Sequence, residues 1–176
     1  MSDRGHVFIA DNDAHGANTL RDLLVENGYS VDYETRGRDA LAAIPAAEPN
    51  LLMLDVNLPD MDSFELREKL KASKQTLYIP VIFMTSYDDA DGRVKGLELG
   101  DDLITKPFDK REVLARVERQ VTVSKVRMAL RESEAKFRSV MESAIDAIIS
   151  GDVSGNIRAW NSAATALFQY TEEEVI

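Results

Sequence analysis

The sequence predicts an α/β protein in which a doubly wound, five-stranded parallel sheet is followed by a long helix and a partial α+β segment. Short apolar runs alternate with longer segments whose leucines recur at spacings of three and four residues, and this alternation is typical of parallel strands joined by helices. The composition, with 44% hydrophobic and 30% charged residues, is that of a folded chain. Its 176 residues provide for one well-filled core and a shorter remainder.

Five short apolar runs are the predicted strands: residues 7–10, 30–35, 51–54, 81–84 and 103–105. The four segments between them carry apolar residues at helical spacing and are the predicted helices: residues 14–27, 38–46, 63–72 and 90–99. Gly28 and Gly100 follow two of these helices, where a helix C-terminus favours a residue with positive φ.

Four polar side chains follow four of the predicted strands. Asp11, Asp55, Thr85 and Lys106 each lie at or directly after the carboxyl end of a strand. In a doubly wound fold, ligands bind outside the carboxyl ends of the strands, at the point where the strand order reverses. We therefore expect these four side chains to gather at one edge of the sheet.

This combination of side chains suits phosphoryl transfer to a carboxylate. Asp11 and Asp55 supply hard oxygen ligands for Mg²⁺, Lys106 a fixed positive charge and Thr85 a hydroxyl. The apolar run before Asp55 buries its strand and leaves the carboxylate at the tip that faces solvent. Asp55 is therefore the predicted nucleophile.

The segments VFIADND, LLMLDVNLPDMD, VIFMTSYDD and ITKPFD follow one another in an order and spacing that resemble the receiver domain of bacterial response regulators, over about residues 4–121. The resemblance implies a flavodoxin-like strand order 2-1-3-4-5. It also implies that Asp55 is the phosphorylation site, that Asp11 helps to hold Mg²⁺, and that Asn57 offers its backbone carbonyl to the metal.

The resemblance assigns roles to four further residues. Thr85 is the signalling hydroxyl, and Lys106 contacts the phosphoryl oxygens. Pro107 follows that lysine and is usually cis in the family, and Pro59 belongs to the loop after the acceptor. The phosphoryl donor is then a sensor histidine kinase or a histidine phosphotransfer protein.

Two residues depart from the family's pattern. Asn12 stands where the family has a second acid that binds the metal, so we expect weaker Mg²⁺ binding than in a typical receiver unless Asp13 turns toward the site. Leu103 stands where the family commonly has the aromatic that rotates inward with Thr85, so the usual aromatic switch is absent. Ser63 also replaces a common glycine, which suggests a modest change in the turn.

After Pro107 the pattern indicates a long helix that leaves the domain. Its apolar seam follows the three and four spacing of a heptad at Leu114, Val117, Val121, Ser124 and Met128. We expect this helix to link copies of the chain as a homodimer and to carry the signal onward.

The C-terminal segment resembles the opening third to half of a PAS sensory domain: a strand, the DVSGN turn, a strand that ends at Trp160–Asn161, and a helix of small residues. The expected divisions are a receiver domain at 1–121, a linker helix at 122–136 and a partial PAS domain at 137–176. We expect the chain to be part of a longer protein with a further output domain, and PAS cofactor binding is not expected in this part.

The charge and composition exclude some functions. A net charge of −10 argues against binding to nucleic acid or anionic lipid. The chain has no cysteine and no apolar run long enough to cross a membrane, so the cytoplasm is the expected location. The expected role is that of a phosphoacceptor switch and not of an enzyme.

Two alternatives remain open at the level of sequence. A haloacid-dehalogenase-type phosphatase would use Asp11 and Asp13 at their two-residue spacing, Thr85, and the later pair Asp101 and Asp102, although His15 does not fit that family's motif. A pseudo-receiver would keep the fold as a binding module without phosphorylation.

Overall fold

A computed structural model describes residues 4–86 and 89–176 of the chain. The chain divides into two compact units, Met1–Arg127 and Met128–Ile176, which are described separately. Helix α5 (Lys110–Ser143) contributes residues to both units. Among the described residues, no helix is long and apolar enough to cross a membrane.

The first unit contains all of the predicted strands and helices, with ends that differ from the prediction by at most two residues. Its strands are β1 (His6–Ala10), β2 (Ser30–Glu34), β3 (Leu51–Asp55), β4 (Val81–Ser86) and β5 (Asp102–Lys106). Its helices are α1 (Ala14–Glu26), α2 (Gly37–Ala47), α3 (Ser63–Lys71), α4 (Ala90–Leu99) and the first part of α5.

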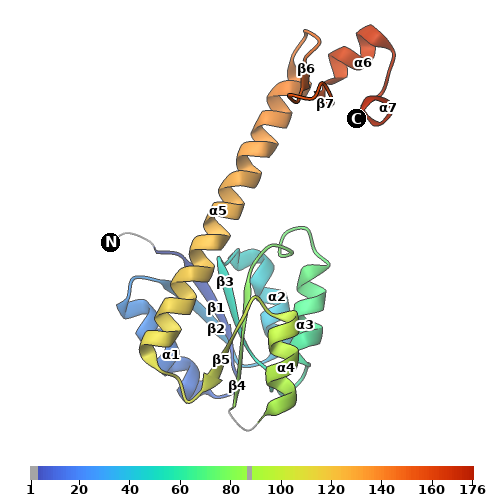
Figure 1. The fold of residues 1–176 in the computed structure, drawn as a ribbon. Helices are drawn as coiled ribbons and strands as arrows, with labels where there is room; N and C mark the ends of the chain where they lie inside the picture. The colour runs from blue at the N-terminus through green and yellow to red at the C-terminus, as the bar shows by residue number, and fades with distance from the viewer. Residues whose placement is uncertain (1–3, 87–88) are drawn as a thin grey trace. The chain divides into compact units, whose positions relative to one another are not determined.

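The strands form one parallel sheet in the order β2-β1-β3-β4-β5, which confirms the predicted fold class. Figure 1 shows α1 and α5 on one face of this sheet and α2, α3 and α4 on the other. Each face has its own apolar core, and every residue of the central strand β3 is buried. Burial on both faces explains why the central strands are continuous apolar runs.

Aspartates cap four of the helices. The carboxylates of Asp13, Asp62, Asp89 and Asp109 accept hydrogen bonds from the backbone N–H groups of the first turns of α1, α3, α4 and α5. Such caps satisfy N–H groups that have no partner within the helix. Each cap lies just beyond the carboxyl end of a strand, so the caps also shape the loops at that edge.

Gly28 and Gly100 both follow helices, but a different constraint requires glycine at each position. Gly28 has a φ of 87°, as predicted. The prediction of positive φ is wrong for Gly100, whose φ is −82°. There a Cβ atom would lie 2.6 Å from the carbonyl oxygen of Gly96 and 2.8 Å from the ring of Phe83, so close packing and not backbone conformation requires glycine.

The second unit begins with the end of α5 and continues with an antiparallel pair, β6 (Ile149–Gly151) and β7 (Ile157–Trp160). Helices α6 (Ser162–Phe168) and α7 (Glu172–Val175) follow, so the order expected of an opening PAS segment is present. The carboxylate of Asp152 accepts the backbone N–H groups of Ser154 and Asn156 and thereby closes the turn between the strands.

Asn161 holds the second unit together. Its Oδ1 accepts the N–H groups of Ile148 and Ala164, and its Nδ2 donates to the carbonyl oxygens of Met141 and Asp146. The residue is 1% exposed, so all of these bonds are shielded from water. A buried amide that is fully hydrogen-bonded fixes the ends of α5 and β7 and the start of α6 in one arrangement.

The seam predicted along α5 is wrong for all of its residues except the exposed Met128, because the others are buried or partly buried within the chain. Val117 is 0% exposed and Val121 is 3% exposed, and both belong to the core between α5 and the sheet. Ser124 is also buried, at 3%. Packing of a helix on its own sheet requires apolar residues at the same spacing as a coiled coil, so the pattern alone did not distinguish the two.

Candidate phosphoacceptor site

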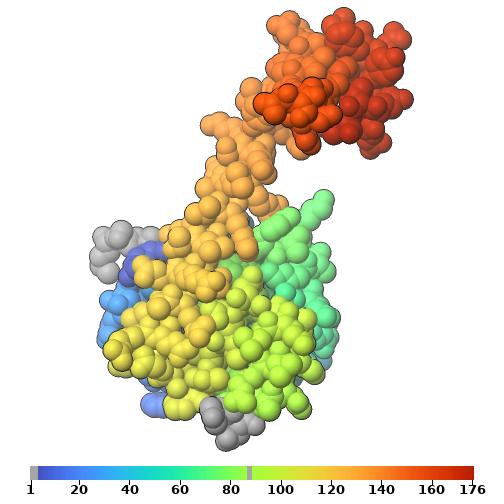
Figure 2. Space-filling view, viewed as in Figure 1, coloured from blue at the N-terminus to red at the C-terminus, as the bar shows by residue number. Residues whose placement is uncertain are grey.

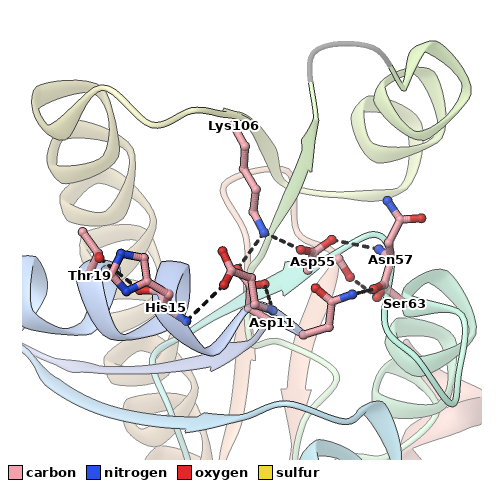
Figure 3. A network of polar contacts seen from close by, with 9 residues as sticks. Asp11, His15, Thr19, Asp55, Asn57, Ser63 and Lys106 are labelled. Atoms are coloured by element: carbon pink, nitrogen blue, oxygen red, sulfur yellow. Dashed lines mark hydrogen bonds and ion pairs between the residues drawn. The ribbon is translucent and has the colours of Figure 1, made fainter.

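The structure brings Asp11, Asp55 and Lys106 together at the carboxyl edge of the sheet (Figure 3). They come from the ends of β1, β3 and β5. The Lys106 ammonium donates to Oδ2 of Asp11 at 2.7 Å and also to Oδ2 of Asp55. Parallel strands place their carboxyl ends at one edge, so residues far apart in the sequence form one site.

Burial and charge set the protonation of this group. Asp11 is fully buried, and burial raises the pKa of its carboxyl, although the hydrogen bond from Lys106 opposes that effect. Burial alone would lower the pKa of Lys106, but its hydrogen bonds to Asp11 and Asp55 outweigh burial and raise that pKa. The lysine is therefore a permanent cation at the centre of the site.

Hydrogen bonds hold both the side chain and the backbone of Asp55. Its carboxylate Oδ1 accepts the N–H of Asn57 at 2.8 Å, and its backbone carbonyl accepts the Ser63 hydroxyl. Ser63 is fully buried at the start of α3. From the sequence, Ser63 was expected only to change the turn. The hydroxyl that replaces a common glycine was the one feature that could have predicted its hydrogen bond to the backbone of Asp55.

Asn12 donates a hydrogen bond within this site. Its Nδ2 donates to the backbone carbonyl of Asn57 at 2.8 Å, and a carbonyl only accepts, so the amide must present its NH₂ group there. Asp13 does not replace the missing acid, because its carboxylate caps α1 through the N–H of His15. The remaining donor set consists of the carboxylates of Asp11 and Asp55 and the carbonyl of Asn57, all hard oxygens that suit Mg²⁺.

Thr85 lies beside this group, but its hydroxyl bonds a residue outside it. Met84 pairs with Asp55 in the sheet and Thr85 follows it, yet the Thr85 hydroxyl donates to Oδ2 of Asp89, 3.0 Å away. Asp89 is the N-cap of α4 and accepts the N–H of Gly92 through its other oxygen. The hydroxyl is therefore bonded to the start of α4.

Leu103 fills the space between β5 and α4. Leu103 is 9% exposed, and its Cδ1 atom lies so close to α4 that a Cβ atom added at Gly96 would be only 2.6 Å from it. The side chain of Leu103 has no polar group, so it cannot form a hydrogen bond that changes when Thr85 moves. The structure therefore links Thr85 to α4 through Asp89 and gives Leu103 a packing role.

The loop residues have separate positions. Pro59 is exposed after β3, and the peptide bond between Lys106 and Pro107 is cis. The next residue after Pro59, Asp60, accepts the N–H groups of Gly37 and Arg38. Asp60 thus ties the loop that follows the acceptor to the first turn of α2.

The phosphatase alternative does not assemble in this structure. Asp101 accepts the N–H of Val81, and Asp102 pairs with Arg116 at the start of β5. Lys106 ends that strand, so the late acidic pair lies at the opposite edge of the sheet from Asp11. Asp13, the second acid of the alternative, serves as the cap of α1.

These features define a class of protein: a signalling receiver, in which a parallel α/β sheet presents two carboxylates and a lysine at one edge. Residues 7–118 match the family model of the response regulator receiver domain, and the chain belongs to that family. Residues 135–176 match the PAS fold, with the long helix α5 leading into them.

Known proteins share the first unit. The chain is 39% identical to the transcriptional regulatory protein PcoR of Escherichia coli over 112 residues, which cover 63% of this chain and 49% of PcoR. The signal receiver domain of a signal transduction histidine kinase from Syntrophus aciditrophicus is 33% identical, with a TM-score of 0.62 over 67% of this chain and 90% of that one.

The receiver domain of the sensor histidine kinase PA1611 from Pseudomonas aeruginosa, solved with a magnesium ion in its active-site cleft, shares the fold. It is 19% identical, with a TM-score of 0.62 over 67% of this chain and 98% of that one. The chain spans about half the length of the curated relatives that it matches.

Proposed function

We propose that the chain is a phosphorylation-controlled receiver module that accepts a phosphoryl group from a phosphohistidine partner onto Asp55. The observation that carries the proposal is the Lys106 ammonium, which bonds the carboxylates of Asp11 and Asp55 at the carboxyl edge of the sheet. The proposed divisions are a receiver at 1–121, a linker helix at 122–136 and a partial PAS domain at 137–176.

In the proposed transfer, a carboxylate oxygen of Asp55 attacks the phosphorus of the donor. The bond between phosphorus and the donor's imidazole nitrogen breaks, and the imidazole leaves with the bonding electron pair. Lys106 already reaches the attacking carboxylate and is placed to stabilise charge on the phosphoryl oxygens. Asp55 is 5% exposed, so this attraction operates with little screening by water.

Mg²⁺ is the proposed cofactor. The carboxylates of Asp11 and Asp55 and the backbone carbonyl of Asn57 would hold it, and when bound it supplies positive charge that neutralises phosphoryl oxygens. Asn12 competes for one of these ligands, because its amide already occupies the Asn57 carbonyl. Weak metal binding is therefore expected for two reasons: Asn12 lacks the negative charge of the usual acid, and its amide competes for the Asn57 carbonyl.

Asn12→Asp is therefore expected to raise the affinity for Mg²⁺ by at least about tenfold, since the change adds a carboxylate and frees the Asn57 carbonyl. Titration calorimetry of the unphosphorylated chain measures this affinity. Asn18→Asp, on the exposed side of α1, adds the same charge away from the site and is the matched control. Equal affinities in the two variants would contradict the assigned role of Asn12.

A sensor histidine kinase or a histidine phosphotransfer protein is the proposed donor. A pocket beside the acceptor, formed by α1 and the loop after β5, offers a surface for it. Leu20, Leu23 and Phe108 provide apolar lining, and Lys106 lies at its edge. A partner seated there would bring its phosphohistidine next to the carboxylate of Asp55.

Thr85 is the proposed signalling hydroxyl. Its movement toward a phosphoryl group on Asp55 would break its bond to Asp89 and weaken the N-cap of α4. That helix contains two glycines and exposes Val94 and Leu97, so little else stabilises it. Phosphorylation would thus alter α4 without an aromatic at residue 103.

Thr85→Val is expected to preserve phosphorylation of Asp55 but to abolish its effect on α4. Valine has the shape of threonine and fills the same buried position, yet it bonds neither Asp89 nor a phosphoryl group. Hydrogen exchange of residues 90–99 should rise on phosphorylation in the parent chain and stay constant in the variant. Ser86→Ala, the exposed neighbouring position, should behave as the parent chain does; a constant exchange in the parent would refute this route.

Acetyl phosphate with Mg²⁺ tests the function directly. We expect intact-mass spectrometry to show one added phosphoryl group per chain, and fragmentation to place it on Asp55. Release of many phosphates per chain without a stable adduct would instead indicate a phosphatase. No adduct, from acetyl phosphate or from phosphohistidine donors, would indicate a pseudo-receiver.

The proposed output runs along α5. Its N-terminal part packs on the sheet and its C-terminal part leads into the PAS segment, so a change at the sheet can be passed along one continuous helix. We propose that the chain works as a homodimer through this helix, in the cytoplasm, as a switch and not as an enzyme. Equal dimer fractions with and without phosphorylation would remove the support for this transmission.

A further inference from the structure

Part of helix α5 lies outside the two apolar cores of the first unit. Every residue from 125 to 140 is exposed, and Figure 2 shows this stretch, in orange, uncovered on the face in view. Isolated helices of this length are marginally stable in water, because most helical stability in proteins comes from packing of an apolar face. Packing of an apolar face on a partner would therefore stabilise this stretch.

Five apolar residues and one serine recur along residues 123–140 at alternating spacings of three and four residues. They are Val123, Val126, Leu130, Ser133, Phe137 and Val140. At 100° per residue they fall within an arc of about 100°, on the opposite side of the helix from the buried Val117 and Val121. We call these six residues the α5 seam.

The α5 seam is uncharged, and all of its members except the half-buried Val123 are exposed. Val126 is 64% exposed, Leu130 59%, and Phe137 and Val140 61% each. Isolated apolar side chains on a surface are ordinary, but a continuous stripe of this kind marks an interaction surface. Its spacing of 3.5 residues on average fits a supercoiled partner helix with the same repeat.

We propose that the α5 seam packs against the same seam of a second copy of the chain as a two-stranded coiled coil. Val123, Leu130 and Phe137 occupy one core position of the heptad, and Val126, Ser133 and Val140 the other. No second helix among residues 4–86 and 89–176 carries such a repeat, so another copy is the partner that matches it. This inference rests on the proposed function only for its use in signalling.

The charge distribution favours this place of contact. The whole chain carries a net charge of −10, so two copies repel each other over most of their surface. Residues 122–143 contain five basic residues (Lys125, Arg127, Arg131, Lys136 and Arg138) and three acidic ones (Glu132, Glu134 and Glu142). This stretch is thus close to neutral, and its charges lie outside the α5 seam.

Sedimentation of the unphosphorylated chain tests the seam. Leu130→Glu and Phe137→Glu are each expected to weaken dimerisation by at least about a hundredfold, because each places two carboxylates in the apolar core of the pair. Met128→Glu changes a side chain that is 55% exposed on the same helix but outside the seam, and it should leave the dimer intact. Circular dichroism confirms that the receiver remains folded in each variant.

Cysteine crosslinking locates the contact, since the chain has no cysteine of its own. If the two helices are parallel, Val126→Cys chains and Val140→Cys chains should each form disulfide-linked dimers. If the helices are antiparallel, disulfides should instead form in a mixture of Val126→Cys chains with Phe137→Cys chains. Either pattern supports the seam, and Glu132→Cys on the outer face should not crosslink.

A monomer at all concentrations, or a dimer unaffected by both glutamate variants and without these disulfides, would overturn the inference. Phosphorylation of Asp55 is measured in the same variants. A monomeric parent chain that still takes a phosphoryl group on Asp55 would contradict the seam alone, and a dimeric parent chain without incorporation would contradict the proposed function alone.

Discussion

Asp55→Asn is expected to abolish phosphoryl incorporation from both acetyl phosphate and a phosphohistidine donor. The amide carries no negative charge and is a poor nucleophile, and its single oxygen cannot accept from both Lys106 and the N–H of Asn57 as the two carboxylate oxygens do. The fold should persist, because Lys106 keeps its bond to Asp11 and Ser63 still supports the backbone of residue 55. Intact-mass spectrometry measures the loss.

Asp62→Asn is the matched control for this change. Asp62 also lies after β3, but its carboxylate caps α3, and asparagine caps helices as well as aspartate does. Incorporation in this variant should equal that of the parent chain. Retention of the phosphoryl group in Asp55→Asn, or its location on another residue, would disprove the assignment of the acceptor.

Lys106→Met is expected to reduce both phosphorylation and stability. Methionine has a similar length but no charge, so the buried carboxylates of Asp11 and Asp55 would be left side by side without a cation. Removal of one partner from a buried ion pair typically costs about 3–5 kcal/mol of unfolding free energy. Loss of a positioned charge should also slow phosphoryl incorporation by at least about a hundredfold.

Urea denaturation without divalent cations, at several pH values, measures the stability change. Burial already raises the pKa of Asp11, and loss of the lysine would raise it further. The folded variant therefore binds a proton more readily than the unfolded chain, and its stability should fall as pH rises above the ordinary carboxyl range. Lys74→Met, at an exposed lysine after α3, should change neither property; a stable Lys106→Met at neutral pH would contradict this account.

The positions of Asp11, Asp55 and Lys106 followed from local sequence. Short buried runs predicted the strands, and the rule that parallel strands place their carboxyl ends together predicted one shared edge. Gly28 was likewise predictable, because a positive φ after a helix is a local requirement. Gly100 was not, since its reason is contact with Phe83 and Gly96, residues brought near it by packing.

The sequence could not indicate what each polar side chain bonds. The sequence predicted weaker Mg²⁺ binding from the missing charge at Asn12, but it gave no sign that the Asn12 amide donates to the Asn57 carbonyl, 45 positions away along the chain. The bond between Thr85 and Asp89 spans only four positions, yet it depends on how β4 leads into α4. Such bonds depend on distances and angles that are fixed only when loops from different strands meet.

By itself, the sequence determined the α/β class, the order of the elements and the identity of the residues at the carboxyl edge, because hydrophobic periodicity and strand ends are local properties. The tertiary structure alone decided which part of α5 is buried. Val121 and Met128 belong to one predicted heptad seam, yet Val121 is 3% exposed because it packs in the core against the sheet, whereas Met128 is 55% exposed.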